Sequence, residues 1–300
     1  LAQRNTPIHP WNISNLPEGF SLSIKRDDLT GSTLSGNKVR KLEFLLADAL
    51  NKKCDTIFTC GGVQSNHCRA TAVAARQLGL DCYLFLRSSE QSTDIGCKGN
   101  LFLNKMVGSR IIVVPKLQYK SGLKQMMEKM AEKLKQQGSS AYLIEIGGSS
   151  YTGMFGYLTA FQEMMQQNVL EDYDDIVVTV GSGGTASGIA IGNYLTGSKL
   201  NKAKQTAPIA IHNVCFSFCF SSVQKECKRS VSRCIQLLTG LVGKTMNKQK
   251  NIIEISRTTG ILVDPVYNIK AIRGMLTEMK NNPGRFKGKR VLYIHTGTRF

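Results

Sequence analysis

The feature that most limits the fold of this chain is the alternation of short apolar runs with longer segments of helical periodicity. Runs rich in β-branched and aromatic residues separate segments in which apolar residues recur every three or four positions. We predict strands at 56–60, 82–87, 111–114, 142–146, 176–180, 208–214 and 291–295. We predict helices at 66–79, 121–136, 154–167, 184–195 and 268–280. This alternation is typical of an α/β protein with a parallel sheet.

Composition limits the size and the environment of the protein. A chain of 300 residues with 42% hydrophobic residues can form one or two domains, and its apolar runs are far shorter than the roughly 20 residues that span a bilayer. We therefore expect no membrane partner. Nine cysteines, an odd number, favour free thiols in a reducing compartment, so we expect a cytoplasmic protein. The sequence begins with Leu, so a lost presequence and a mitochondrial location stay open.

The net charge of +18 raises the question of a nucleic-acid partner. Much of the excess lies between Lys225 and Lys250, where seven basic residues face Glu226 alone. This stretch has no aromatic residue that could stack on a base, and we find no zinc-finger or RNA-binding signature. The cysteines nearby lack the paired short spacing of zinc ligands. We interpret the stretch as a solvated basic face and expect neither a nucleic acid nor a metal.

The first unusual turn, GGVQSNH, lies between the predicted strand at 56–60 and the predicted helix at 66–79. Ligands of open α/β sheets bind beyond the carboxyl ends of the strands, so such turns are where chemistry is expected. Two glycines are followed by Gln64, Ser65, Asn66 and His67 at a helix N-terminus, which is suited to an anion. The alternative is a simple helix cap made by Ser65 or Asn66. Four polar residues behind two glycines favour a site.

The second turn, GSGGTASG, follows the predicted strand at 176–180 and opens a helix. Its glycines let successive backbone N–H groups converge on a phosphate, and the hydroxyls of Ser182 and Thr185 add donors. Glycines needed only for close packing of strand and helix are the alternative. The segment also fits the dinucleotide pattern GxGxxA, which expects an acidic residue about 20 positions later. No Asp or Glu occurs between Asp175 and Glu226, so a monophosphate fits better than NAD.

Lys38 follows a Gly-Asn turn at the start of an amphipathic helix. The inner face of this helix consists of Val39, Leu42, Leu45, Leu46 and Ala49. Lys38 is either an ordinary surface residue or a nucleophile. A helix N-terminus and the cations Lys25, Arg26, Arg40 and Lys41 would lower its pKa, and Asp27 and Asp28 would oppose this. An amine nucleophile beside a phosphate cradle describes an enzyme that holds pyridoxal 5'-phosphate. A third turn, HTG at 295–297, is weak support alone.

Four segments carry a family resemblance: IKRDDLTGSTLSGNKVRKLEFLLADAL, GGVQSNHCRATAVAARQLGLDCYLFLR, DDIVVTVGSGGTASGIAIG and TTGILVDPVYNIKAIRGM. They closely resemble the D-cysteine desulfhydrase and 1-aminocyclopropane-1-carboxylate deaminase family, over residues 6–200 and 252–297. The resemblance implies a homodimer with the tryptophan-synthase-β-like fold (fold type II), with two open, mostly parallel sheets and flanking helices. It implies a large cofactor-binding domain of 1–44 and 156–300, and a small inserted α/β domain of 45–155.

The resemblance also implies which residues hold the cofactor. Lys38 of SGNK would bind pyridoxal 5'-phosphate as an imine and move the protons of the substrate. Asn66 of QSNH would bond the ring hydroxyl, and Thr296 of HTG would meet the pyridine nitrogen. The phosphate would be held by Gly181, Ser182, Gly183, Gly184 and Thr185.

The substrate implied by the resemblance is a small D-amino acid. Gln64, Ser65 and Asn66 would bind its carboxylate, with Ser65 near the reacting centre. Tyr267 of DPVY would lie over the substrate, so Lys38, Ser65 and Tyr267 are the expected catalytic residues.

The residues after Tyr267 and His295 help to choose the reaction. Family members that open the cyclopropane ring resemble one another in having Glu after this tyrosine and Leu in the place of Thr296, whereas desulfhydrases have small hydroxyl residues at both places. Asn268 matches neither pattern and Thr296 matches the desulfhydrases. We therefore expect β-elimination of D-cysteine to pyruvate, hydrogen sulfide and ammonia, with 1-aminocyclopropane-1-carboxylate deaminase as the alternative.

Three departures from the family pattern leave a catalytically impaired cofactor-binding homologue open. A Gly-x-Gly-Tyr segment with a second tyrosine is missing before the helix that contains NIIEISRTTG. The resemblance fades between about 212 and 245, and the chain ends HTGTRF where members continue from HTGG into a helix. A defective or misassembled reading of the gene would explain these regions.

Overall fold

The computed structural model describes residues 1–31, 36–88, 96–115, 122–200, 210–215, 234–238 and 245–297. The helices are α1 (Lys38–Asn51), α2 (Asn66–Gln77), α3 (Asn100–Met106), α4 (Lys124–Gln136), α5 (Tyr151–Gln166), α6 (Val169–Asp172), α7 (Gly184–Leu200), α9 (Thr245–Thr259) and α10 (Asn268–Asn281). The strands are β1 (Ile8–Pro10), β2 (Ser21–Lys25), β3 (Thr56–Gly62), β4 (Asp81–Arg87), β5 (Arg110–Val114), β6 (Ala141–Leu143), β7 (Asp175–Val180), β8 (Ala210–Cys215), β9 (Cys234–Leu238) and β10 (Arg290–Ile294). Short 3₁₀ turns are η1 (Asp27–Leu29), η3 (Ile146–Gly148) and η4 (Pro283–Arg285).

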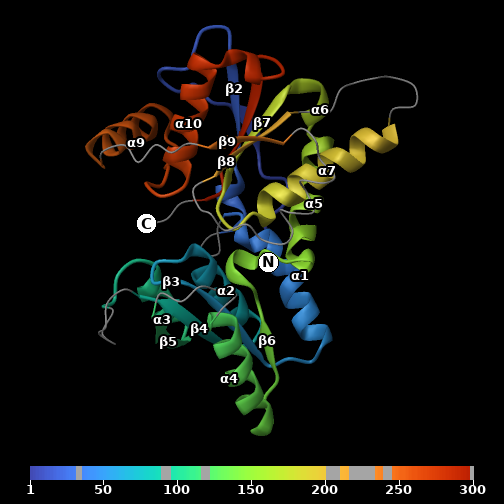
Figure 1. Cartoon of the computed structure of the whole chain (residues 1–300), viewed down its shortest axis with the longest axis vertical. Helices are drawn as coiled ribbons and strands as arrows, with labels where there is room; N and C mark the ends of the chain where they lie inside the picture. The colour runs from blue at the N-terminus through green and yellow to red at the C-terminus, as the bar shows by residue number, and fades with distance from the viewer. Residues whose placement is uncertain are drawn as a thin grey trace.

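The described strands form two sheets, one in the upper and one in the lower half of Figure 1. The six-stranded sheet has the order β1-β2-β10-β7-β8-β9, and only its edge pair β1–β2 is antiparallel. The four-stranded sheet has the order β5-β4-β3-β6 and is parallel throughout. The expected α/β class with two mostly parallel sheets is confirmed. The division into domains at residues 45 and 155 stays a prediction.

The predicted strands agree with the structure except at 142–146. There β6 ends at Leu143 and the chain enters η3, in which Gly147 and Gly148 have φ values of 68° and 62°. The prediction lacks β1, β2, β9, α3 and α6, because elements of three to seven residues are too short to show a clear period. Most of the basic segment 225–250 lies outside the described residues, as do Cys219 and Cys227.

Apolar side chains cover both faces of each sheet. Along β7, Val177 points to one face and packs with Tyr293 and α10, whereas Ile176 and Val178 point to the other face and pack with α5 and α7. This alternation follows from the pleat of a strand, in which successive side chains lie on opposite faces. The four-stranded sheet packs against α1 and α2 on one face and α4 on the other. Each sheet is therefore the middle layer of a sandwich.

Helix α1 contributes to this core and also buries charge. The predicted inner face from Val39 to Ala49 is confirmed, since each of its five apolar residues is at most 2% exposed. Arg40 and Lys41 on the same helix are also buried, at 3% and 1% exposed. Helix α5 packs against both α1 and α7. The first turn of α1 therefore places two cations inside the protein.

Among the described helices, none combines the length and apolar character that a membrane crossing requires. Five of the cysteines, from Cys54 to Cys97, are free thiols, as predicted for this part of the chain. Three of them, Cys60, Cys68 and Cys82, are buried.

Candidate active site

The turn before Lys38 packs directly on the HTG turn after β10. The backbone N–H of Asn37 donates to the carbonyl of Thr296 at 3.1 Å. Gly36 has a φ of +86°, and a Cβ there would lie 2.6 Å from the same carbonyl oxygen. Only glycine fits this backbone conformation and this close approach. The structure thus brings together SGNK and HTG, two of the predicted motifs.

The same turn also contacts the glycine-rich loop after β7. The side chain of Asn37 donates from Nδ2 to the hydroxyl of Thr185 at 2.9 Å. A small cavity opens here, lined by Asn37, Lys38, Lys41 and residues 179–183, 185 and 186. Lys38 and the predicted phosphate loop therefore share one cavity.

The glycine-rich loop leads into helix α7, whose first residue is Gly184. Gly183 has a φ of +99°, which turns the chain sharply into the helix. The backbone N–H of Gly184 donates to Ser149 Oγ at 3.2 Å, and Ser149 Oγ donates to Ser182 Oγ at 2.6 Å. Free backbone donors at a helix N-terminus attract an anion.

Ser149 belongs to a loop that the sequence analysis passed over. The segment GGSS at 147–150 follows β6 and packs against the glycine-rich loop. A Cβ on Gly147 would collide with the side chain of Ser182. The available signal was a Gly-Gly-Ser-Ser turn after a predicted strand, the same combination that marked the two turns that were chosen.

Lys38 and Lys41, which we call the lysine pair, lie one turn apart at the cavity. Burial lowers the pKa of Lys38 to about 8. The pKa of Lys41 lies well below its ordinary value because of burial and the charge of Lys38. Lys41 Nζ donates to the carbonyl of Gly147 at 3.2 Å, and a Cβ on Gly184 would lie 3.0 Å from it. Lys41 was missed as a site residue because its sequence position suggests only a helix surface.

The lowered pKa of Lys38 was predicted, but its cause was not. We expected neighbouring cations to lower it, whereas the structure attributes the shift to burial. Asp27 does not oppose the shift, because its carboxylate binds Arg40. Arg26 binds Asp28 in the same way.

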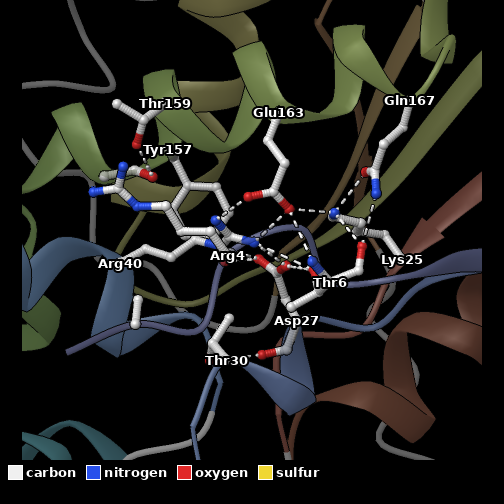
Figure 2. Close-up of polar contacts among 12 residues, drawn as sticks. Arg4, Thr6, Lys25, Asp27, Thr30, Arg40, Tyr157, Thr159, Glu163 and Gln167 are labelled. Atoms are coloured by element: carbon white, nitrogen blue, oxygen red, sulfur yellow. Dashed lines mark hydrogen bonds and ion pairs between the residues drawn. The ribbon is translucent and has the colours of Figure 1, made fainter.

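A second group of buried charges also touches α1, and Figure 2 shows its contacts. We call Lys25, Asp27, Arg40 and Glu163 the paired cluster. Arg40 binds Asp27 and Glu163 at 2.9 Å each, and Lys25 binds Glu163 at 2.5 Å. Burial opposes ionisation, yet hydrogen bonds from Arg40 and Lys25 lower the pKa of Glu163 to about 2. Tyr157 also donates to Asp27, at 2.7 Å, so each charge of the cluster has an opposite charge and further polar partners.

The residues of GGVQSNH bind mainly to their own surroundings. Ser65 caps α2, its Oγ accepting from the N–H of Cys68 at 3.2 Å, so the simple cap that we had kept as the alternative is present. Gln64 donates to the carbonyl of Lys98 and accepts from the N–H of Asn100, both at 2.9 Å. Asn66 Oδ1 accepts from Asn100 at 2.7 Å. None of these three predicted site residues lines the described cavity.

His67 is buried next to the lysine pair. Its Nε2 lies 2.8 Å from Thr59 Oγ1, and that hydroxyl donates to the carbonyl of Ile144, so the ring donates to Thr59. Burial and the charges of Lys38 and Lys41 hold the pKa of His67 well below its ordinary value. His67 is therefore a neutral residue beside the cavity.

Tyr267 and Thr296 approach the site from the carboxyl-terminal part of the chain. The ring of Tyr267 lies over the glycine-rich loop, because a Cβ on Gly181 would be 3.6 Å from Tyr267 Cε1. Asn268 turns into the core instead: its Nδ2 donates to Asp264 at 2.9 Å and to the carbonyl of Gly297 at 2.6 Å. Asn268 thus fixes the HTG turn without facing the cavity.

These residues fit pyridoxal phosphate. In the described part of the chain no ion pair involves either member of the lysine pair, so the cavity has an excess of positive charge. A phosphate at the start of α7 would balance that charge, and Lys38 offers a weakly basic amine for the aldehyde. The donor set matches an anionic aldehyde cofactor.

Comparison with known proteins agrees with this fit. The chain matches the family described as pyridoxal-phosphate dependent enzyme over residues 1–297. It is 39% identical to the bifunctional D-cysteine desulfhydrase/1-aminocyclopropane-1-carboxylate deaminase, mitochondrial, of Arabidopsis thaliana, over 99% of this chain and 77% of that protein. It is 32% identical to the D-cysteine desulfhydrase of Yersinia enterocolitica, over 99% and 95%.

Solved structures show the same fold. A crystal structure of an ACC deaminase homologue has a TM-score of 0.80 and 33% identity, covering 99% of this chain and 90% of that one. Maize serine racemase, at 15% identity and a TM-score of 0.67 over 99% and 89%, shares the fold alone. The chain therefore belongs to the pyridoxal-phosphate dependent enzymes of fold type II, in the branch of the D-cysteine desulfhydrases and 1-aminocyclopropane-1-carboxylate deaminases.

Proposed function

We propose that this enzyme eliminates hydrosulfide from D-cysteine, giving pyruvate, hydrogen sulfide and ammonia with uptake of one water. The observation that carries the proposal is the lack of a carboxylate among the described residues that line the cavity. The residue after Tyr267, where deaminases resemble one another in having Glu, is Asn268, and its amide is bound inside the core.

The lack of a carboxylate bears on the choice of reaction. Bound pyridoxal phosphate supplies an aldehyde for the substrate amine and a ring that withdraws electrons from the substrate Cα. Withdrawal is weaker when no acidic residue keeps the ring nitrogen protonated. Thr296 offers at most a hydroxyl at this point. Hydrosulfide is a good leaving group, and its departure from Cβ demands less electron withdrawal than breaking a carbon–carbon bond.

The phosphate is proposed to bind at the start of α7. Gly181, Ser182, Gly183, Gly184 and Thr185 would donate backbone and hydroxyl hydrogen bonds. Lys41 would add a charge-assisted hydrogen bond from below, since its Nζ already lies near Gly184. Ser149 would hold the loop by its contacts to Ser182 and Gly184.

Lys38 is proposed to act both as the cofactor attachment point and as the base. Its pKa of about 8 leaves a usable fraction of neutral amine near neutral pH. Once displaced by the substrate amine, Lys38 Nζ would take the proton from Cα as hydrosulfide leaves Cβ. Tyr267 would close over the substrate from α10. Its ring lies over the glycine-rich loop.

The substrate carboxylate is proposed to bind at the N-terminus of α2, at Gln64, Ser65 and Asn66. The first turn of a helix points its backbone N–H groups towards its N-terminus, where an anion is stabilised, and this general property supports that role. The side chain of Gln64 is already bonded to Lys98 and Asn100. Its backbone N–H, rather than its side chain, would therefore donate to the substrate carboxylate.

We also propose that the protein is a homodimer that acts in the cytoplasm. The family resemblance supports the dimer, and free thiols support a reducing compartment. The name of the Arabidopsis relative includes mitochondrial, so mitochondria are the alternative for this chain.

A deaminase activity on 1-aminocyclopropane-1-carboxylate is the second candidate. It is favoured by one observation, the 33% identity to the ACC deaminase homologue over nearly the whole chain.

Product analysis separates the two activities. Purified protein loaded with pyridoxal phosphate is incubated with D-cysteine, L-cysteine or 1-aminocyclopropane-1-carboxylate. We expect sulfide and pyruvate in equal amounts from D-cysteine alone. Ammonia and a four-carbon keto acid from the cyclopropane substrate, without sulfide from D-cysteine, would reassign the enzyme. Lys38→Ala is the control: borohydride should no longer fix the cofactor to the chain.

A further inference from the structure

Asn100, the first residue of α3, joins three parts of the structure that are distant in sequence. It is 2% exposed. Its Nδ2 donates to the carbonyl of Gln64 at 3.1 Å and to Asn66 Oδ1 at 2.7 Å. Its Oδ1 accepts from Arg69 Nη1 at 3.3 Å. Asn100 thus binds the turn before α2 through Gln64 and Asn66, and binds the helix itself through Arg69.

The orientation of the Asn100 amide is fixed by chemistry. The carbonyl of Gln64 can only accept a hydrogen bond, and the guanidinium of Arg69 can only donate one. Turning the Asn100 amide over would place oxygen against oxygen at Gln64 and nitrogen against nitrogen at Arg69. Asn100 therefore donates to Asn66, and Asn66 must accept with its amide oxygen.

We propose that Asn100 is a positioning residue for cofactor binding, which orients the amide of Asn66 so that its NH₂ group faces the cofactor. The inference rests on the proposed function and on the role that the family resemblance implies for Asn66, a hydrogen bond to the ring hydroxyl of the cofactor. An NH₂ donor stabilises the ionised form of that hydroxyl, whereas an amide oxygen would favour the protonated form. We call this chain of hydrogen bonds, from Asn100 through Asn66 to the cofactor, the relay. Through it, Asn100 sets the ionisation of the ring hydroxyl without touching the cofactor.

Arg69 supports the relay at a cost to stability. Its side chain is 5% exposed, and among the described residues its Nε and Nη2 have no hydrogen-bond partner. A buried cation with two unpaired donors lowers the stability of the fold. Its one contact, to Asn100 Oδ1, is the contact that holds the amide in the required orientation.

Asn100→Asp tests the inference, because the new carboxylate still accepts from Arg69 but has no donor for Gln64 or Asn66. Asn66 must then turn its own NH₂ group away from the cofactor. We expect the ratio of ionised to protonated ring hydroxyl, read from the visible and near-ultraviolet bands of the pyridoxal phosphate-loaded protein, to fall about tenfold. Asn100→Ala releases Asn66 without reversing it and should lower the ratio about threefold.

Asn104→Ala is the matched control. Asn104 lies one turn later on α3, is fully buried, and its amide has no hydrogen-bond partner among the described residues. We expect Asn104→Ala to leave the band ratio unchanged, which separates the effect on Asn66 from the general effect of truncating a buried asparagine of α3. If Asn100→Asp does not fold, the pair Asn100→Ala and Asn104→Ala decides.

Two outcomes would contradict the inference. A band ratio in the Asn100 variants within twofold of the parent, or an equal shift in Asn104→Ala, would overturn the relay while leaving the proposed function intact. A parent protein that shows no visible band with pyridoxal phosphate would overturn the proposed function, and the relay with it.

Discussion

Helix α1 carries buried cations into two different surroundings. Arg40 points into the paired cluster, where two cations meet two carboxylates and each charge has a partner within 3 Å. Lys38 and Lys41 point into a cavity with no carboxylate among its described lining residues. A closed set of charges stabilises a fold, whereas an open set of one sign prepares a site for a ligand of the other sign. Arg40 therefore belongs to the charges that stabilise the fold, whereas its neighbours Lys38 and Lys41 belong to the proposed cofactor site.

Glu163→Gln gives the largest effect that we expect on the paired cluster. Removing this carboxylate leaves Lys25 and Arg40 with only Asp27, and breaking a buried pair costs about 3–5 kcal/mol of unfolding free energy. Denaturant titration measures the loss. Glu128→Gln is the control, because Glu128 pairs with Lys124 at 3.7 Å on the surface and its loss should cost less than about 0.5 kcal/mol. Equal losses would mean that the cluster is not stabilised by its pairing.

Lys41→Met should not lower the unfolding free energy, in contrast to Glu163→Gln. It removes a buried cation without an acidic partner, so the cofactor-free protein should keep its stability or gain some. Affinity for pyridoxal phosphate should fall about tenfold to a hundredfold, the equivalent of about 1.5–3 kcal/mol for a hydrogen bond to a charged group. Binding titration of the cofactor-free protein tests this, with exposed Lys129→Met as the control. Lower stability with unchanged affinity would place Lys41 with the structural charges.

The two charge groups should also respond to pH at opposite ends of the scale. The pKa of Lys38 falls from 10.5 to about 8 on folding, so the unfolded chain holds more protons between these values and the cofactor-free protein gains stability as pH rises through them. We expect about 1–2 kcal/mol after allowing for partial exposure. Lys38→Met should remove the share of the gain that belongs to Lys38, and Lys41, whose pKa is also lowered by burial, should keep a remaining gain.

The matching acid-side effect belongs to Glu163, whose pKa falls from 4.5 to about 2. Its stabilisation is present above pH 4.5 and is lost as pH falls towards 2. Denaturant titrations across both ranges test the pair of predictions. A parent protein whose stability does not change from pH 8 to 10.5 would contradict the lowered pKa of Lys38.

The adjacent Ser149 and Ser150 give the smallest expected effects, one on cofactor binding and the other on stability. Ser149→Ala removes the contacts to Ser182 and Gly184 and should weaken cofactor binding by about 0.5–1.5 kcal/mol. Ser150→Ala removes the cap of α5, whose Gly153 N–H it accepts at 3.2 Å, and should cost about 1 kcal/mol of stability without weakening the cofactor. Calorimetry of both variants, with and without pyridoxal phosphate, measures the difference. The reverse result would exchange their roles.

The fold could be predicted from the sequence because its signals are local. Apolar runs and helical periods lie within single elements, and they predicted the strands from β3 to β8 and the helices between them except the short α3 and α6. Lys38 and the loop from Gly181 were also found locally, since each combines an unusual residue with a turn. The edge strands β1 and β2 were not found, because their pairing rather than their composition defines them.

The missing part of the site depends on contacts between distant residues. Lys41 resembles a surface lysine until α5 and the loop at Gly147 cover it. The hydrogen bond from the N–H of Asn100 in α3 to the side chain of Gln64 joins residues 36 positions apart, and no local sequence pattern predicts it. Site residues that act through long-range burial therefore require the structure.

The position of β10 bears on how the protein is made. This strand lies between β2 and β7, and its HTG turn accepts the hydrogen bond from Asn37. A nascent chain can complete the four-stranded sheet once β6 has been made, but β1 and β2 must wait for the much later β10 before they join the six-stranded sheet. Until β10 is in place, the turn before Lys38 lacks the carbonyl of Thr296 to which Asn37 donates, so we expect the proposed cofactor site to form only after β10 has been made.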